Sequence, residues 1–302
     1  MTIPFEVKVG AENSEEQTKV FEIVNSTFDE VDIIYNNWNP KSEISFLNQL
    51  PAHKKHKLSK DLEMFLKECE AYVRLTDGKF DPTIGPFHKL WTSRLENGGI
   101  PSKEEITRVF QKVGWQHIHI EDGYFYKDEE GVSIDLGGVA KGYAVDIIVD
   151  RLNKAGFDNI YVSWGGEIKT KGRHPSDREW TVLVRFWEPP EEAKVPMNNG
   201  ALATSGDYLQ FWKILEKGKE KRFSHIIDIS KQSPIRITKD SISSVSILSD
   251  SCLKSDILAT CGMLFSDPEE AQLWYESKKK SFLSFDFWIF SHNKGIKRKG
   301  SI

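Results

Sequence analysis

The sequence is poor in cysteine and contains no long run of apolar residues. Its three cysteines, Cys69, Cys252 and Cys261, form no CxxC pair, and their odd number excludes a fully paired disulfide framework. No stretch approaches the roughly 20 apolar residues of a membrane-spanning helix. No charged-then-apolar signal opens the chain. We therefore expect either a soluble cytosolic protein or a mature form from which an export segment has been removed.

A surplus of positive charge is also absent, because the formal net charge is -4. Nucleic-acid binding requires a basic footprint, so the composition argues against a nucleic-acid partner. Hydrophobic residues make up 39% of the chain and aromatic residues 12%. This balance is typical of a globular protein with one large core or two fused ones.

Apolar residues recur at helical spacing in several stretches, and short strand-like segments lie between them. The pattern predicts a strand over 3–9, a helix from about 15 to 35, and a helix that Ser59 caps and Gly78 ends. Ser102 and Glu105 form a capping-box pattern at another helix start. Further helices are predicted at 139–154, 251–265 and after Asp267, and strands at 159–162, 180–184, 222–228 and 243–248. This irregular mixture predicts an α+β fold, in one unit over residues 1–302 with no clear linker.

Three other segments are defined by their turn residues. Residues 117–126 and 131–135 alternate like a hairpin pair around Asp-Gly and Glu-Gly turns. The stretch 188–196 is rich in proline and glutamate, which predicts an exposed loop and excludes a central strand. Residues 203–207 are polar and lie between apolar runs, which favours a second loop.

The first cluster with chemical potential is the stretch from Asp135 to Gly142, in which a strand end passes through Gly137 and Gly138 into a helix. Glycines there let backbone N–H groups approach an anion, and Lys141 in the first helical turn adds a positive charge. The spacing matches neither a P-loop nor a dinucleotide fingerprint. A Gly-Gly turn that only serves packing remains the alternative.

The second cluster is Asp256 and Thr260, which are four residues apart on a predicted helix and so share one face. A carboxylate and a hydroxyl are hard oxygen ligands of the kind that Mg²⁺ prefers. The alternative is that Asp256 caps the helix and Thr260 bonds back to a carbonyl. The third cluster is His225 with Asp228 on a predicted strand, a combination too common to identify a function by itself.

The order and wording of these stretches together resemble the ApbE family of FAD:protein FMN transferases. The matching motifs are Asn37 to Ile44 with Asn48, Phe80 to Pro86, Asp135 to Asp146, Gly165 to Ile168, Ala203 to Tyr208, His225 to Asp228, and Ser255 to Thr260. They occur in family order along the whole chain, which is far more specific than any single motif. One departure is the segment after Asp228, where Ile229 to Pro234 replaces the family's Pro-x-Thr-Gly.

The resemblance implies a two-lobed, T-fold-related arrangement of mixed sheets and packed helices, with FAD between the lobes. It implies that Trp38 stacks on the flavin ring, as an aromatic face allows. It implies magnesium ligation by Asp256, Thr260 and the main-chain carbonyl of Gly138, and a functionally required histidine at His225. The residues that resemble the family's FAD contacts are Met1, Trp38, Lys79, Phe80, Asp81, Asp135, Lys141 and Ile227.

The resemblance also implies a reaction and its partners. A Thr or Ser hydroxyl of an acceptor protein would attack the FMN-side phosphorus of FAD, with Mg²⁺ neutralising charge as the bond to AMP breaks. The family's acceptors are respiratory or redox-pump subunits, and its members are exported and often lipid-anchored in the periplasm. Two alternatives remain open, a magnesium-dependent FAD pyrophosphatase that gives FMN and AMP, and a flavin-binding protein without activity.

Overall fold

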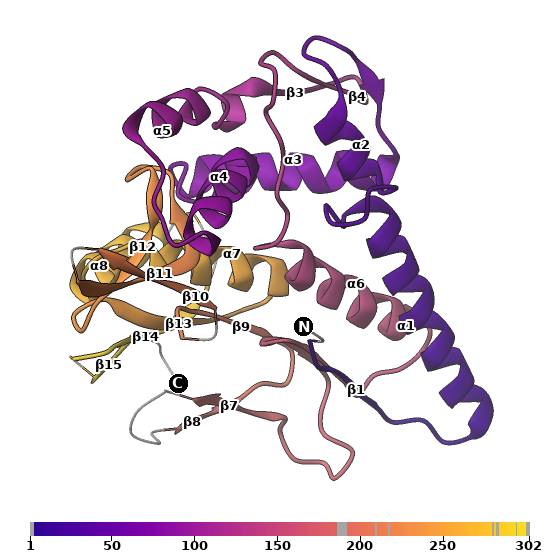
Figure 1. Cartoon of the computed structure of the whole chain (residues 1–302). Coiled ribbons are helices and arrows are strands. Elements are labelled where there is room, and N and C mark those ends of the chain that lie inside the picture. The colour runs from indigo at the N-terminus through magenta and orange to yellow at the C-terminus, as the bar shows by residue number, and fades with distance from the viewer. Residues whose placement is uncertain are drawn as a thin grey trace.

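A computed structural model shows an α+β protein in which a mostly helical lobe lies against a large antiparallel sheet (Figure 1). The structure describes residues 3–185, 192–208, 210–216, 218–279, 281, 284–293 and 295–299. This architecture confirms the predicted fold class. The helices are α1 (Ser14–Ile34), α2 (Glu43–Gln49), α3 (Lys60–Leu75), α4 (Gly85–Glu96), α5 (Lys103–Phe110), α6 (Ala140–Lys154), α7 (Cys252–Met263) and α8 (Pro268–Lys278), with short 3-10 turns at Pro82–Ile84 and Trp115–His117. Across the described ranges, no helix has the length and apolar character needed to cross a bilayer.

The main sheet has seven strands in the order β1-β5-β6-β9-β13-β14-β15, and each neighbouring pair is antiparallel. Its strands are β1 (Phe5–Val9), β5 (Ile160–Trp164), β6 (Glu167–Lys171), β9 (Ala201–Gly206), β13 (Ile242–Ser249), β14 (Asp286–Ser291) and β15 (Gly295–Lys299). The first and last strands of the chain thus form opposite edges. The central strands come from the second half of the sequence.

Three smaller sheets complete the fold. The first contains β10 (Phe211–Glu216), β11 (Lys219–Asp228) and β12 (Ser233–Ile237), and the second contains β2 (His56–Lys57), β3 (Ile118–Glu121) and β4 (Tyr124–Lys127). The third is a hairpin of β7 (Thr181–Arg185) and β8 (Glu192–Pro196). That hairpin packs through Val182, Val184 and Val195 against Leu202 and Trp288 of the main sheet, on the side away from α6 and α7 (Figure 1).

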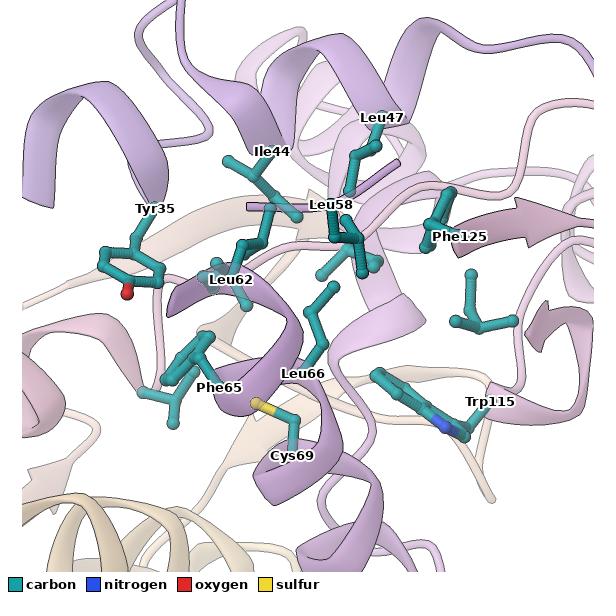
Figure 2. Packing of buried hydrophobic residues seen from close by; sticks show 14 of the residues in the cluster. Tyr35, Ile44, Leu47, Leu58, Leu62, Phe65, Leu66, Cys69, Trp115 and Phe125 are labelled. Carbon is teal, nitrogen blue, oxygen red and sulfur yellow. The ribbon is translucent and has the colours of Figure 1, made fainter. Parts of the chain in front are cut away.

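The helical lobe has its own hydrophobic core, in which α2 and α3 face the hairpin of β3 and β4 (Figure 2). Leu62, Phe65 and Leu66 of α3 are fully buried in it. Burying a side chain of this size stabilises the fold by about 1.5–3 kcal/mol. The predicted caps of the surrounding helices are confirmed, since the Ser59 hydroxyl accepts from the Leu62 N–H. Ser102 forms the expected capping box.

Helix α7 joins this core to the core beside the main sheet. Leu253 and Ile257 pack into the helical lobe, whereas Leu258 and Met263 pack under β13 and β14. Every residue of α7 except Thr260 is buried. A helix that is buried all round loses its amphipathic pattern. Its single opening to solvent therefore lies at Thr260.

Three predictions about chain segments are wrong. Residues 131–135 form no strand, because side chains satisfy their backbone: Asn48 bonds both backbone groups of Ile134, and Lys127 donates to the Val132 carbonyl. Residues 192–196, the described part of the predicted loop 188–196, form β8, although in a two-stranded hairpin and not a central strand. Residues 201–206, predicted as a polar loop from 203, form the central strand β9.

Candidate active site

The site begins at the turn that leads into α6. Gly137 and Gly138 are exposed, and an added Cβ at Gly138 would meet nothing within 4 Å. The Asp135 side chain fixes the turn by accepting from the Gly137 N–H at 2.8 Å. No side chain caps the following helix. Its positive end is therefore open to an anion, as the glycines predicted.

A close approach of α6 and α7 brings the next residues together. A Cβ at Gly142 would lie 2.7 Å from the Cys252 carbonyl oxygen, so only glycine fits between these helices. The Gly142 N–H points at the Asp256 carboxylate, with an N···Oδ2 distance of 3.4 Å. Asp146, one turn further along α6, accepts from the backbone N–H groups of Cys252 and Leu253 at 2.9 Å each. One helix thus caps and positions the other.

Asp256 and Thr260 lie on one face of α7, as predicted from their spacing. Asp256 does not cap the helix, since the N-cap is Ser251. The Thr260 hydroxyl lies 3.0 Å from the hydroxyl of Ser205 on β9. Thr260 therefore lies where α7 contacts the main sheet, whereas Asp256 faces α6.

Three titratable groups lie together beside Gly142: the buried Glu167 and Asp256 and the partly buried Lys141. The Lys141 ammonium lies 2.6 Å from Oε1 of Glu167, the first residue of β6, and Asp256 interacts electrostatically with both. Burial raises the pKa of Asp256 to about 7, against the opposing effect of Lys141. Burial alone would lower the pKa of Lys141, but the charges of Asp256 and Glu167 raise it on balance. Because two carboxylates surround one ammonium, the cluster attracts a further cation.

Asp256 of this cluster is one of the predicted magnesium ligands. In the described part of the chain, no group of three or more His, Cys, Asp or Glu side chains is arranged to hold a metal ion. The predicted ligands, however, are one carboxylate, one hydroxyl and one backbone carbonyl, which Mg²⁺ completes with waters and phosphate oxygens. Oε2 of Glu167 is also buried, without a hydrogen-bond partner among the described residues. An unpaired buried carboxylate oxygen is costly, and a bound cation nearby would offset that cost.

His225 lies on β11. Its Nδ1 is 3.1 Å from the backbone carbonyl oxygen of Gln210. Burial lowers the pKa of His225, the bond to Gln210 raises it, and positive charge on His88 and Lys141 lowers it. The imidazole is therefore neutral near pH 7. Because a carbonyl only accepts, Nδ1 carries the proton and Nε2 offers a lone pair.

Trp38 and Asp135 are joined by contacts with His88 of α4. The Trp38 ring is 73% exposed and borders a hollow of about 250 Å³ together with Asn37, Pro40 and Asn48. His88 meets the Trp38 ring edge-on at 6.4 Å between centroids, and its Nδ1 lies 3.7 Å from Oδ2 of Asp135. An exposed aromatic face beside a hollow suits a stacked planar ring.

The remaining predicted residues have internal contacts. The Lys79 ammonium lies 4.3 Å from the centroid of the Phe265 ring, and Phe80 is buried in the helical core. Asp81 accepts from the Thr83 hydroxyl and from the Trp115 N–H, and burial raises its pKa. The Ile227 side chain packs against Phe87 and Trp91. Met1 lies outside the described residues. Their roles toward FAD stay predictions.

Two residues near the predicted site had no role in the sequence prediction. Glu167 belongs to the motif Gly165 to Ile168. Its position directly after two glycines was the only local signal that it could lie in a functional site. His88 lies three residues after Gly85, near the end of another motif, and nothing in the local pattern marks it. The structure brings them in from β6 and α4, which are separate elements from α6 and α7.

Comparison with known proteins agrees with the resemblance. The ApbE family model matches residues 1–283. A protein of Chlamydia pneumoniae named FAD:protein FMN transferase is 36% identical over 279 residues, which cover 91% of this chain and 86% of that protein. The flavin transferase ApbE of Vibrio cholerae superposes with a TM-score of 0.79 at 26% identity, covering 98% of this chain and 93% of that one. The apo flavinyl transferase ApbE of Pseudomonas stutzeri has the same fold, with a TM-score of 0.81, 23% identity, and coverage of 98% and 94%.

Proposed function

The chain belongs to the ApbE family, and we propose that it uses Mg²⁺ to transfer FMN from FAD onto a Thr or Ser hydroxyl of an acceptor protein, releasing AMP. It is a transferase of flavin, as its relatives are named. The observation that carries the proposal further is the grouping of Lys141, Glu167 and Asp256 at the start of α6, with Thr260 one turn after Asp256 on α7. This set combines a phosphate-binding helix end with oxygen ligands for a cation.

His225 is suited to take the proton of the attacking hydroxyl. Its pKa is lowered by burial, so it is unprotonated near pH 7, and its Nε2 is the free acceptor. As the hydroxyl proton moves to Nε2, the hydroxyl oxygen forms a bond to the FMN-side phosphorus. The bond from that phosphorus to the bridging oxygen breaks, and the oxygen leaves with AMP.

Lys141 and the Gly137–Gly138 turn hold the diphosphate in this scheme. Because the pKa of Lys141 is raised by its two carboxylate neighbours, the ammonium keeps its charge at every physiological pH. Asp256, Thr260 and the Gly138 carbonyl would hold the metal. When bound, Mg²⁺ supplies positive charge that neutralises the diphosphate as the bond to AMP breaks.

The test is to incubate the protein with FAD, Mg²⁺ and a candidate acceptor domain of a redox-pump subunit. Transfer predicts AMP release in equal amount to a covalently flavinylated acceptor, seen by mass spectrometry. An acceptor with its target Thr replaced by Ala and the Asp256→Ala enzyme serve as controls. Free FMN and AMP without a labelled acceptor would instead identify a pyrophosphatase, and FAD binding without AMP would identify a carrier. Unchanged transfer in excess chelator would refute the role of magnesium.

A further inference from the structure

We propose that His88 is a further binding residue of this site, which contacts the ribityl-phosphate segment of FAD between the flavin ring and the reacting phosphorus. The inference rests on the proposed function, because it identifies the ligand as FAD. No motif of the sequence includes a role for this histidine.

The first observation is where His88 lies. It projects from the second turn of α4, with 28% of its side chain exposed. Its ring is edge-on to Trp38, which marks the flavin end of the site. On another side, its Nδ1 faces Oδ2 of Asp135, the residue that fixes the glycine turn before α6. His88 therefore lies between the aromatic that suits the flavin and the glycine turn that suits the phosphates.

The second observation is how the ring is oriented. Nδ1 faces Oδ2 of Asp135 at 3.7 Å, which is within ion-pair range but longer than a hydrogen bond. Nε2 lies on the opposite side of the ring, and no contact to it is recorded within the described ranges. A half-buried histidine whose Nδ1 faces a carboxylate presents Nε2 to a ligand. Hydroxyls of the ribityl chain and oxygens of the FMN phosphate are the groups of FAD that such a nitrogen can bind.

The third observation concerns what lies on the other side of the turn. Lys141, Glu167 and Asp256 form the charged cluster beside the α6 N-terminus, where the diphosphate is expected. His88 does not belong to that cluster, since its contacts within the described ranges are with Asp135 and Trp38. Its contribution should therefore fall on the FMN half of the substrate and not on the AMP half.

The experiment measures ligand affinities in the full-length His88→Ala protein, without acceptor or turnover. Quenching of flavin fluorescence gives the dissociation constants of FAD, FMN and riboflavin, and competition against FAD gives that of AMP. We expect FAD and FMN to bind about tenfold more weakly, the scale of one lost hydrogen bond with partial charge, while AMP is unchanged. Riboflavin has the ribityl chain but no phosphate. If His88 contacts the ribityl chain, riboflavin should bind His88→Ala more weakly than wild type; if His88 contacts only the phosphate, its affinity should be unchanged.

Two variants control for an effect on folding. Lys89→Ala changes the exposed neighbouring residue of the same helix and should leave all four affinities unchanged. His88→Gln keeps a side-chain hydrogen-bonding group and should recover part of the loss. If His88→Ala weakened the binding of AMP and FMN equally, the role of His88 would be merely structural. Wild-type FMN affinity in His88→Ala would overturn the inference. If the wild type binds FAD but labels no acceptor, the proposed transfer fails, while these binding constants still decide the role of His88.

Discussion

Replacing Gly142 by alanine should separate the two helices of the site and impair the chemistry more than the fold. The new methyl carbon would lie 2.7 Å from the Cys252 carbonyl oxygen and 3.1 Å from Cβ of Asp256. Since such atoms normally stay about 3.4 Å or more apart, α7 must retreat by roughly 0.7 Å. Overpacking of this kind costs about 1–3 kcal/mol, and the better helix propensity of alanine returns about 1 kcal/mol. The free energy of unfolding should therefore fall by only about 0–2 kcal/mol.

The effect on catalysis should be larger, because the retreat carries Asp256 away from the Gly142 N–H and from the α6 N-terminus. A displacement approaching 1 Å at a reacting centre costs up to about 10²-fold in rate. AMP release at saturating FAD, measured over a series of Mg²⁺ concentrations, should fall at least about tenfold, while thermal unfolding shows a cooperative transition near that of the wild type. Gly10→Ala is the control, because an added Cβ there meets nothing within 4 Å. Wild-type rate and Mg²⁺ response in Gly142→Ala would refute the idea that this helix contact sets the site.

Trp38→Ala should weaken FAD binding by about 1–3 kcal/mol, the scale of a lost aromatic stack on a base, and reduce the quenching of flavin fluorescence. An unchanged dissociation constant would show that Trp38 does not touch the flavin. His225→Ala should keep FAD affinity while transfer falls roughly 10²–10⁴-fold, and transfer at the wild-type rate would reject its role as base. Because burial raises the pKa of Asp256 to about 7, this carboxyl stabilises the fold fully only below its unfolded pKa of about 4. The melting temperature of the metal-free protein should therefore fall as pH rises from about 4 through 7. Asp256→Asn should lose this part of the pH dependence of the melting temperature. An identical pH profile in that variant would contradict its assignment to Asp256.

The helices were predictable because their signals are local. Ser59, Ser102 and Asp267 each cap a helix within three residues, and no distant contact is needed to recognise them. The strand β9 was not predictable for the opposite reason. Its polar residues Thr204 and Ser205 bond to Ser246 and Thr260, partners at least 40 residues away that make polar side chains acceptable in a central strand.

The site divides in the same way. Asp256 and Thr260 are four residues apart, so helix geometry alone predicted their common face. The pairing of Lys141 with Glu167 depends on β6 lying beside the start of α6, which no sequence pattern near either residue shows. The role of Gly142 was equally hidden, because its need for glycine comes from the backbone of Cys252 on another helix. Contacts between different elements determine the Lys141–Glu167 pair and the need for glycine at 142. Spacing within one helix determined the common face of Asp256 and Thr260.

The order of strands in the main sheet also has a consequence for how the chain acquires its structure during synthesis. β1 is made first, but Val9 pairs with Ile160, some 150 residues later, and the central strand β13 follows later still. Contacts of such long sequence separation form slowly, and N-terminal units fold first on the ribosome. The hydrophobic core of the helical lobe therefore stays incomplete until Leu253 and Ile257 of α7 have been synthesised and packed into it. Since the same helix carries Asp256 and Thr260, the proposed site for FAD and metal can be completed only in the last stage of folding.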